Sequence, residues 1–287
     1  MFLTLSAEDL PLNVPFDQTI RIAKATGFGA VDLPMSELFA GPADPSADLV
    51  REKLEAAGLR AGGWWLPVEF REDEDKYQAG MRLLPRAASL ARGLDSPWCV
   101  TWIWPFSDDL DFDSNMRLHV SRLGPVAAQL RDFGIQFGLE FVGPRTLRAG
   151  HKHEFISTLP QTLDLIETLG FDNLGVLLDC WQWYTSGGTV ADLDALEGDQ
   201  IVYAHINDAP LGRDVSAQID EERMLPGATG VIDIENFLKA LNRHDFNGPV
   251  SVEPYNAELT ALEPIERARR ARGSAETVFT RAGIAIA

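Results

Sequence analysis

The feature that most constrains the fold is a regular alternation of short apolar runs with longer amphipathic segments. The apolar runs predict eight β-strands, at residues 2–5, 30–33, 60–67, 97–104, 135–141, 174–179, 199–208 and 248–254. Helical spacing of apolar residues predicts helices over 15–29, 44–59, 75–94 (with a possible kink at Pro85), 114–134 and 158–170, and residues 258–283 supply the last helices. Strands that are apolar on both faces are typical of a parallel sheet covered by helices.

At 287 residues, this alternation favours an α/β fold of the closed (β/α)8 TIM-barrel class, with residues 1–287 forming a single domain. An open doubly wound sheet is the alternative, but such folds usually carry a glycine-rich turn after the first strand. The segment "LTLSAEDLPL" has no such turn. Residues 210–230 form a long, turn-rich βα loop, and in a barrel such loops build the active-site face.

The charge of the chain excludes several classes of partner. It carries 43 acidic and 25 basic residues, a formal net charge of −18. A nucleic-acid-binding protein needs a cationic face to neutralise phosphates, and an anionic membrane surface makes a similar demand. The two cysteines form no CxxC pair, and no apolar run approaches the roughly 20 residues of a membrane span. We therefore expect a cytoplasmic soluble protein whose partners are neither nucleic acids nor membranes.

Each of the last four predicted strands delivers a side chain that can bind a metal near its carboxyl end. These are Glu140, Asp179, His205 and Glu253. In a barrel these ends converge on one mouth, where three carboxylates would repel one another without a cation. An oxygen-rich set with one nitrogen suits one divalent metal, and ligand hardness favours Mn²⁺ over Mg²⁺, Co²⁺ or Zn²⁺.

The chain resembles the xylose-isomerase-like TIM barrels, a superfamily of sugar isomerases and epimerases that includes ketose 3-epimerases and inosose dehydratase. The stretches that carry the resemblance are "GLEFVGPRTLR", "VLLDCWQWYTSGG", "VYAHINDAP", "RMLPGATGVIDIENFLKAL" and "GPVSVEPYN". The resemblance implies that the Glu, Asp, His, Glu set binds one metal and that Glu140 and Glu253 also move protons. One departure stands out: the family often has histidine three residues after the strand-six aspartate, where this chain has Gln182.

Several neighbours of these residues are predicted substrate contacts. Tryptophan faces stack on the C–H faces of sugars, and polar groups after the metal-bearing strands can bind substrate oxygens. The predicted contacts are Trp65, Trp104, Trp181, Gln182, Arg145, Asn207 and Arg223, the last because "ERMLPG" resembles a family loop whose arginine meets the substrate. Glutamine, unlike histidine, cannot become a cation near neutral pH. His151 and His153 are interpreted as a surface pair.

The predicted reaction is proton transfer next to a carbonyl through a metal-bound enediolate, carried out on an unphosphorylated ketose or keto-sugar. The loops after the last two strands lack the glycine-rich cradle of barrel phosphate sites. Isomerisation or epimerisation is the first interpretation, and dehydration or lysis of an inosose or 3-keto-glycoside is the alternative. A non-catalytic barrel subunit is a further rival. An apurinic-site endonuclease is disfavoured by the acidic charge and the five histidines. The sequence leaves open a homo-oligomer or a small second subunit.

Overall fold

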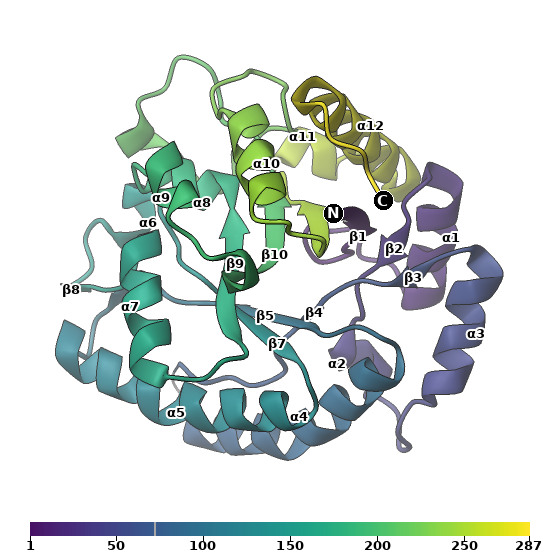
Figure 1. Ribbon diagram of the computed structural model, residues 1–287, viewed down its shortest axis with the longest axis horizontal. Helices are drawn as coiled ribbons and strands as arrows, with labels where there is room; N and C mark the ends of the chain where they lie inside the picture. The colour runs from purple at the N-terminus through teal and green to yellow at the C-terminus, as the bar shows by residue number, and fades with distance from the viewer. Residues whose placement is uncertain (72) are drawn as a thin grey trace.

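The computed structural model describes residues 1–71 and 73–287, and Figure 1 shows the sheet surrounded by helices. In this part of the chain one sheet of nine strands forms the centre. Its members are β1 (Phe2–Leu5), β2 (Ala30–Val31), β3 (Arg60–Ala61), β4 (Trp64–Trp65), β5 (Trp98–Trp102), β7 (Gln136–Glu140), β9 (Leu174–Asp179), β10 (Ile201–Ile206) and β11 (Pro249–Val252). Every pairing within it is parallel, as the apolar runs predicted.

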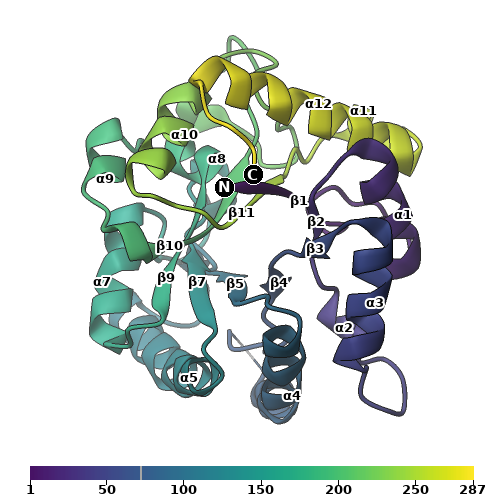
Figure 2. The same cartoon turned by 45° about the vertical axis from the view of Figure 1, so that its right-hand side comes forward.

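The strand order shows how the sheet curls into a barrel. It runs β3-β2-β1-β11-β10-β9-β7-β5-β4, so the first strand pairs with the last. The two ends of the sheet, β3 and β4, belong to one stretch of chain, residues 60–65. The barrel therefore closes through this stretch, and Figure 2 shows the strands arranged around a common axis. This confirms the predicted TIM-barrel class.

The stretch predicted as one strand over 60–67 is divided by Gly62 and Gly63. A Cβ atom on Gly62 would collide with the side chains of Thr4 and Asp32, and one on Gly63 would lie 2.6 Å from the Tyr203 ring. The chain can pass this close to the barrel interior because glycine has no side chain. The local pattern of apolar residues gave no sign of this crowding.

Helices cover the outside of the sheet. The long ones are α1 (Phe16–Thr26), α3 (Ala47–Ala57), α4 (Glu74–Gly93), α5 (Phe112–Asp132), α7 (Leu159–Leu169), α10 (Ile234–Arg243) and α12 (Pro264–Ala282). The short ones are α2 (Met35–Leu38), α6 (Arg145–Arg148), α8 (Cys180–Thr185), α9 (Val190–Asp194) and α11 (Ala257–Thr260), with 3₁₀ turns η1 (Gly198–Gln200) and η2 (Val215–Ala217). The last helices predicted within 258–283 are α11 and α12, and α4 continues through Pro85 as one helix.

Two segments lie outside the regular alternation. β6 (Phe106–Ser107) and β8 (His153–Glu154) form a small antiparallel pair in loops that follow barrel strands. The loop between β10 and α10 contains residues 210–230 and is anchored by the buried Asp208. The Asp208 carboxylate accepts hydrogen bonds from the backbone N–H groups of Thr229, Gly230 and Ile232 at 2.7–3.0 Å. This anchoring folds the long loop back over the mouth of the barrel.

The ends of the chain meet beside β1, where the Ala287 N–H donates to the Met1 carbonyl at 2.9 Å (Figure 2). Within the described residues, no helix has the length and apolar character that a bilayer crossing requires.

Candidate metal centre

Four strands bring four metal-competent side chains together. Glu140 is the last residue of β7, Asp179 is the last of β9, His205 lies near the end of β10, and Glu253 follows β11. One ligand atom from each lies within 4.8 Å of those of the other three, and all four residues are buried. The register explains this convergence, because His205 pairs with Asp179 on one side and with Ser251, two residues before Glu253, on the other.

The imidazole of His205 lies among three carboxylates. Its Nδ1 atom is 3.2 Å from Glu253 Oε2 and 3.7 Å from Glu140 Oε1. Its Nε2 atom, on the other side of the ring, is 3.3 Å from Asp9 Oδ2. The rings of Trp65 and Tyr203 lie 6.1 and 5.3 Å from the imidazole between centroids.

Arg223 supplies the second positive charge of the cluster. Its NH1 atom is 3.0 Å from Asp179 Oδ2 and 2.5 Å from Glu253 Oε2, and its NH2 atom is 2.7 Å from Asp220 Oδ1. The guanidinium also lies 4.8 Å from the centre of the Tyr255 ring. The long loop after β10 therefore places a cation directly beside two of the three clustered carboxylates.

Asp179 is held from the side opposite Arg223. Its Oδ1 atom accepts from the Trp181 backbone N–H at 2.9 Å and from Asn207 Nδ2 at 3.0 Å. The first of these bonds makes Asp179 the N-cap of α8, a helix that the sequence patterns did not predict. The carboxylate is thus fixed in position by both its own helix and the next strand.

Burial and neighbouring charges give the four clustered residues very different pKa values. Burial raises the pKa of Glu140 to about 8 and that of Asp179 to about 6. Burial would also raise the pKa of Glu253, but the charges of His205 and Arg223 outweigh it and hold that pKa at about 2. Burial would lower the pKa of His205, but the charges of Glu253 and Asp9 raise it well above its usual value.

The residues fit a divalent cation. Glu140 Oε1 and His205 Nδ1, 3.7 Å apart, are both buried and have no hydrogen-bond partner in the described structure. Buried polar atoms without a partner cost stability, and a cation between these two atoms would satisfy both. Three carboxylates and one imidazole form a donor set typical of Mn²⁺, Zn²⁺ and similar ions.

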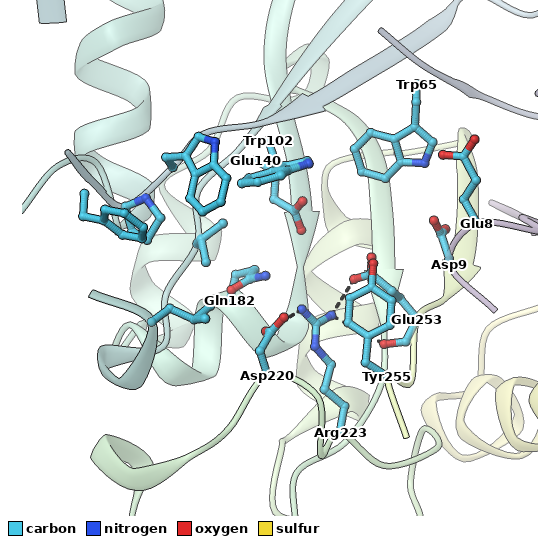
Figure 3. Close-up of a pocket in the computed structure, with 15 residues that line it drawn as sticks. Glu8, Asp9, Trp65, Trp102, Glu140, Gln182, Asp220, Arg223, Glu253 and Tyr255 are labelled. Atoms are coloured by element: carbon cyan, nitrogen blue, oxygen red, sulfur yellow. Dashed lines mark hydrogen bonds and ion pairs between the residues drawn. The ribbon is translucent and has the colours of Figure 1, made fainter. Parts of the chain in front are cut away.

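A cavity of about 330 Å³ opens above the cluster, and Figure 3 shows its labelled side chains pointing inward. One part of its lining is polar and mostly acidic, and the other is aromatic and apolar. The lining residues are Glu8, Asp9, Trp65, Trp102, Trp104, Pro105, Phe106, Glu140, Val142, Leu147, Gln182, Asp220, Arg223, Glu253 and Tyr255. A polyol with one C–H-rich face matches such a divided surface.

The structure places the predicted substrate contacts in three different settings. Gln182, Arg223, Trp65 and Trp104 line the cavity, as does Trp102. Asn207 and Trp181 are fully buried next to Asp179 and are not part of the cavity lining. Arg145 begins α6, is exposed and is not part of the cavity lining. Substrate contact by Arg145, Trp181 and Asn207 stays a prediction, because the cavity lining includes none of the three.

Gln182 has a fixed orientation. Its Oε1 atom accepts from the Gly143 backbone N–H at 2.9 Å. This bond uses the amide oxygen and leaves the NH₂ group as the donor. Gly143 lies so close that an added Cβ would collide with the Gln182 carbonyl oxygen. A neutral donor therefore occupies the position where the resemblance implied histidine.

The two histidines after β7 do not line the cavity. His151 pairs with Asp108 at 2.9 Å through Nδ1 and stacks on the Phe106 ring, with centroids 3.3 Å apart. His153 lies in β8. Their positions agree with the interpretation of a surface pair.

Sequence reasoning missed four polar cavity residues: Glu8, Asp9, Asp220 and Tyr255. Glu8 and Asp9 follow β1 just as Glu140 and Glu253 follow or end their strands. Applying the strand-end argument to the first strand as well as the last four would have found them. Asp220 is placed by the folding of the long loop, which no local pattern reveals.

Comparison with known proteins gives the chain a family context. Residues 20–277 match the family model described as a xylose isomerase-like TIM barrel. Inosose isomerase of Halalkalibacterium halodurans is 25% identical over 212 residues, covering 73% of this chain and 71% of that one. Inosose isomerase of Bacillus subtilis is 33% identical over 144 residues, 48% of each chain. Ketose 3-epimerase of Arthrobacter globiformis is 23% identical over 246 residues, covering 85% of this chain and 78% of that enzyme.

Solved structures agree with the fold. A xylose isomerase domain protein from Alicyclobacillus acidocaldarius superposes with a TM-score of 0.88 at 27% identity, covering 99% of both chains. The IolI protein, solved with a bound zinc atom, superposes with a TM-score of 0.81 at 21% identity, covering 98% of this chain and 99% of that one.

Proposed function

The chain belongs to the xylose isomerase-like TIM-barrel family, and on that premise we propose that it is a divalent-metal-dependent isomerase or epimerase of an unphosphorylated polyol ketone. The observation that carries the proposal is the cluster of Glu140, Asp179, His205 and Glu253. Their ligand atoms lie within 4.8 Å of one another, below a cavity of about 330 Å³. Its relatives include inosose isomerases and a ketose 3-epimerase, which favours an inosose or a ketose as the substrate.

Glu140, Asp179, His205 and Glu253 would hold the metal. A divalent ion bound there supplies Lewis-acid polarisation of a substrate carbonyl, which makes the neighbouring C–H group more acidic. The three-oxygen, one-nitrogen donor set supports Mn²⁺ as the working ion, with Zn²⁺ as its main competitor because the related IolI protein binds zinc.

Glu140 and Glu253 carry the proton transfers in this proposal. Their carboxylates reach the cavity from β7 and β11, different sides of the mouth, as Figure 3 shows. If one removes the proton beside the carbonyl and the other returns a proton to the opposite face, the product is an epimer. Return to the adjacent carbon gives an isomer instead. Two carboxylates facing one substrate carbon are sufficient for both outcomes.

Other lining residues would bind and orient the substrate. The Gln182 amide donates to a substrate oxygen, and Trp65 and Trp104 offer ring faces to C–H groups. The described lining has five acidic residues and one basic residue, Arg223, which already pairs with three carboxylates. A phosphate group would meet repulsion here, which supports an unphosphorylated substrate.

The test is turnover in D₂O with added Mn²⁺, using inososes and ketoses as candidate substrates. Proton transfer predicts one solvent deuterium in the product next to the carbonyl, detected by NMR. Deuterium-free product would overturn the proton-transfer mechanism and indicate a hydride shift. Loss of water, with an unsaturated ketone as product, would replace isomerisation by dehydration on the same site.

A further inference from the structure

Asp9 is a buried carboxylate at the mouth of the barrel and is not one of the four clustered ligands. It follows β1 and is only 1% exposed. Its Oδ2 atom lies 3.3 Å from His205 Nε2 and accepts from the Ser251 hydroxyl at 2.5 Å. Its backbone N–H donates to the Ser6 hydroxyl at 3.1 Å. Both the main chain and the carboxylate of Asp9 are therefore fixed relative to the imidazole.

Folding alone does not explain a carboxylate in this place. The second oxygen, Oδ1, is buried and has no hydrogen-bond partner in the described structure. A buried carboxylate that is only partly satisfied costs stability, and a smaller apolar residue would avoid that cost. Residues that break the rules of packing in this way are expected at functional sites.

The two ring nitrogens of His205 face different surroundings. Nδ1 points to Glu140 and Glu253, the other candidate ligands, while Nε2 points to Asp9. A neutral imidazole has one nitrogen with a proton and one with a lone pair, and only the lone pair can bind a metal. Asp9 Oδ2 accepts from the Ser251 hydroxyl, and an accepting oxygen beside Nε2 favours the ring proton there and leaves the lone pair on Nδ1, on the side of the other ligands.

We propose that Asp9 is a positioning residue that sets the tautomer and ring orientation of His205, with Ser251 holding Asp9 in turn. The chain of contacts runs from Ser251 through Asp9 and His205 to the mouth, so the first and last strands of the barrel both support one ligand. This inference rests on the metal site proposed above. It does not depend on which polyol is the substrate or on the type of reaction.

The test is a comparison of metal affinity in full-length variants at one pH. The Asp9→Asn variant keeps the shape of the side chain but loses its charge. Partners of metal-bound histidines typically contribute 10–100-fold in affinity, so we expect Zn²⁺ and Mn²⁺ to bind about 10–100-fold more weakly, measured by competition with a chelating dye. Ser251→Ala, which removes only the hydroxyl that holds Asp9, should give a smaller loss in the same direction.

A matched control is Glu52→Gln, the same change of carboxylate to amide on the exposed face of α3. Glu52 is not part of the cavity lining, so the metal affinity of this variant should equal that of the unmodified protein. The absorption spectrum of Co²⁺-loaded protein gives a second readout. It should change in Asp9→Asn and not in Glu52→Gln, because it reports the ligand geometry and not the stability of the fold.

Unchanged affinity and an unchanged Co²⁺ spectrum in Asp9→Asn would overturn the inference. If Asp9→Asn does not fold, Ser251→Ala decides the question: a shifted Co²⁺ spectrum supports the positioning role, and an unmodified spectrum overturns it. Metal binding is measured without substrate. A protein that binds metal with this dependence on Asp9 but turns over no polyol would therefore refute the proposed reaction and leave this inference standing.

Discussion

Two histidines of this chain are almost inaccessible to solvent, and they show what burial does in two different regions. His205 is at the mouth, with carboxylates on both sides of its ring, and their charges raise its pKa well above the usual value. His119 is in the helical layer, in α5, where its ring meets those of Phe70 and Phe155 at 5.5 and 4.7 Å between centroids. There, burial lowers the pKa of His119 to about 4.

The difference teaches that burial alone does not identify a functional histidine. Among the described residues, His119 makes one hydrogen bond, between Nδ1 and the Asn115 carbonyl at 2.9 Å, while its buried Nε2 has none and its ring packs against aromatic side chains. His205 lies among charged groups that would be costly to bury unless a ligand completed them. The neighbours of a buried polar group therefore decide whether it is a structural residue or part of a site.

The largest expected effect is a loss of turnover when Glu253, one of the charged neighbours of His205, is changed. Glu253→Gln removes a ligand and a proton-transfer group while keeping the side chain's shape, so turnover should fall by at least about 10³-fold. The measurement is kcat with Mn²⁺ present, with circular dichroism to verify the fold. The exposed Glu276→Gln is the matched control and should retain full turnover. Equal rates in both variants would remove Glu253 from the mechanism.

Added metal should stabilise a variant of His119 but not a variant of His205. An ion at about 1,000 times its dissociation constant stabilises the folded state by about 4 kcal/mol. We expect this increase in the free energy of unfolding in the unmodified protein and in His119→Gln. It is measured by denaturant unfolding, first with chelator and then with the metal restored. The gain should be lost in His205→Gln. A metal-dependent gain that survives in His205→Gln would contradict the assignment of His205 as a ligand.

The pH dependence of the free energy of unfolding should show that His119 is neutral in the folded protein. Because the folded-state pKa of His119 is about 4, below its usual 6.5, the unfolded state takes up the proton first as the pH falls. The stability conferred by neutral His119 is thus complete above pH 6.5 and is lost between about 6.5 and 4. Relative to His119→Gln, the free energy of unfolding should fall by about 3 kcal/mol over that range, measured by urea titrations. Parallel pH profiles for the two proteins would show that His119 does not titrate in this way.

The smallest effect concerns an aromatic residue at the rim of the cavity. Trp104 is 39% exposed and contacts Trp102 and Phe106 at 4.8 and 5.3 Å between centroids. Trp104→Ala should raise KM by several-fold, about 1 kcal/mol, with little change in kcat, since it removes substrate binding and not chemistry. Phe112, which is similarly exposed at 38% at the start of α5, provides the control. Phe112→Ala should leave KM unchanged, and matching effects in the two variants would assign Trp104 to packing alone.

Much of the fold follows from local sequence patterns. The strands at 2–5 and 174–179 have the predicted bounds, because apolar runs of that length leave little choice. The errors have physical causes. The strand over 60–67 is divided at Gly62 and Gly63, which pass close against interior side chains of the barrel. The helix α8 was missed because "CWQWYT" is short and follows directly on the strand, with Asp179 serving both as the last residue of β9 and as the N-cap of the helix.

The sequence by itself determined the alternation of strands and helices and the four side chains that end neighbouring strands. These features depend on periodicity and on the rule that parallel strands present their carboxyl ends together. Only the tertiary structure decided which other residues share the mouth. It placed Arg223 beside two of the clustered carboxylates, left Arg145 exposed and outside the cavity lining, and joined Asp9 to Ser251 across 242 positions of the chain. Closure of the barrel makes the first and last strands neighbours, and a contact over that distance leaves no trace in local pattern.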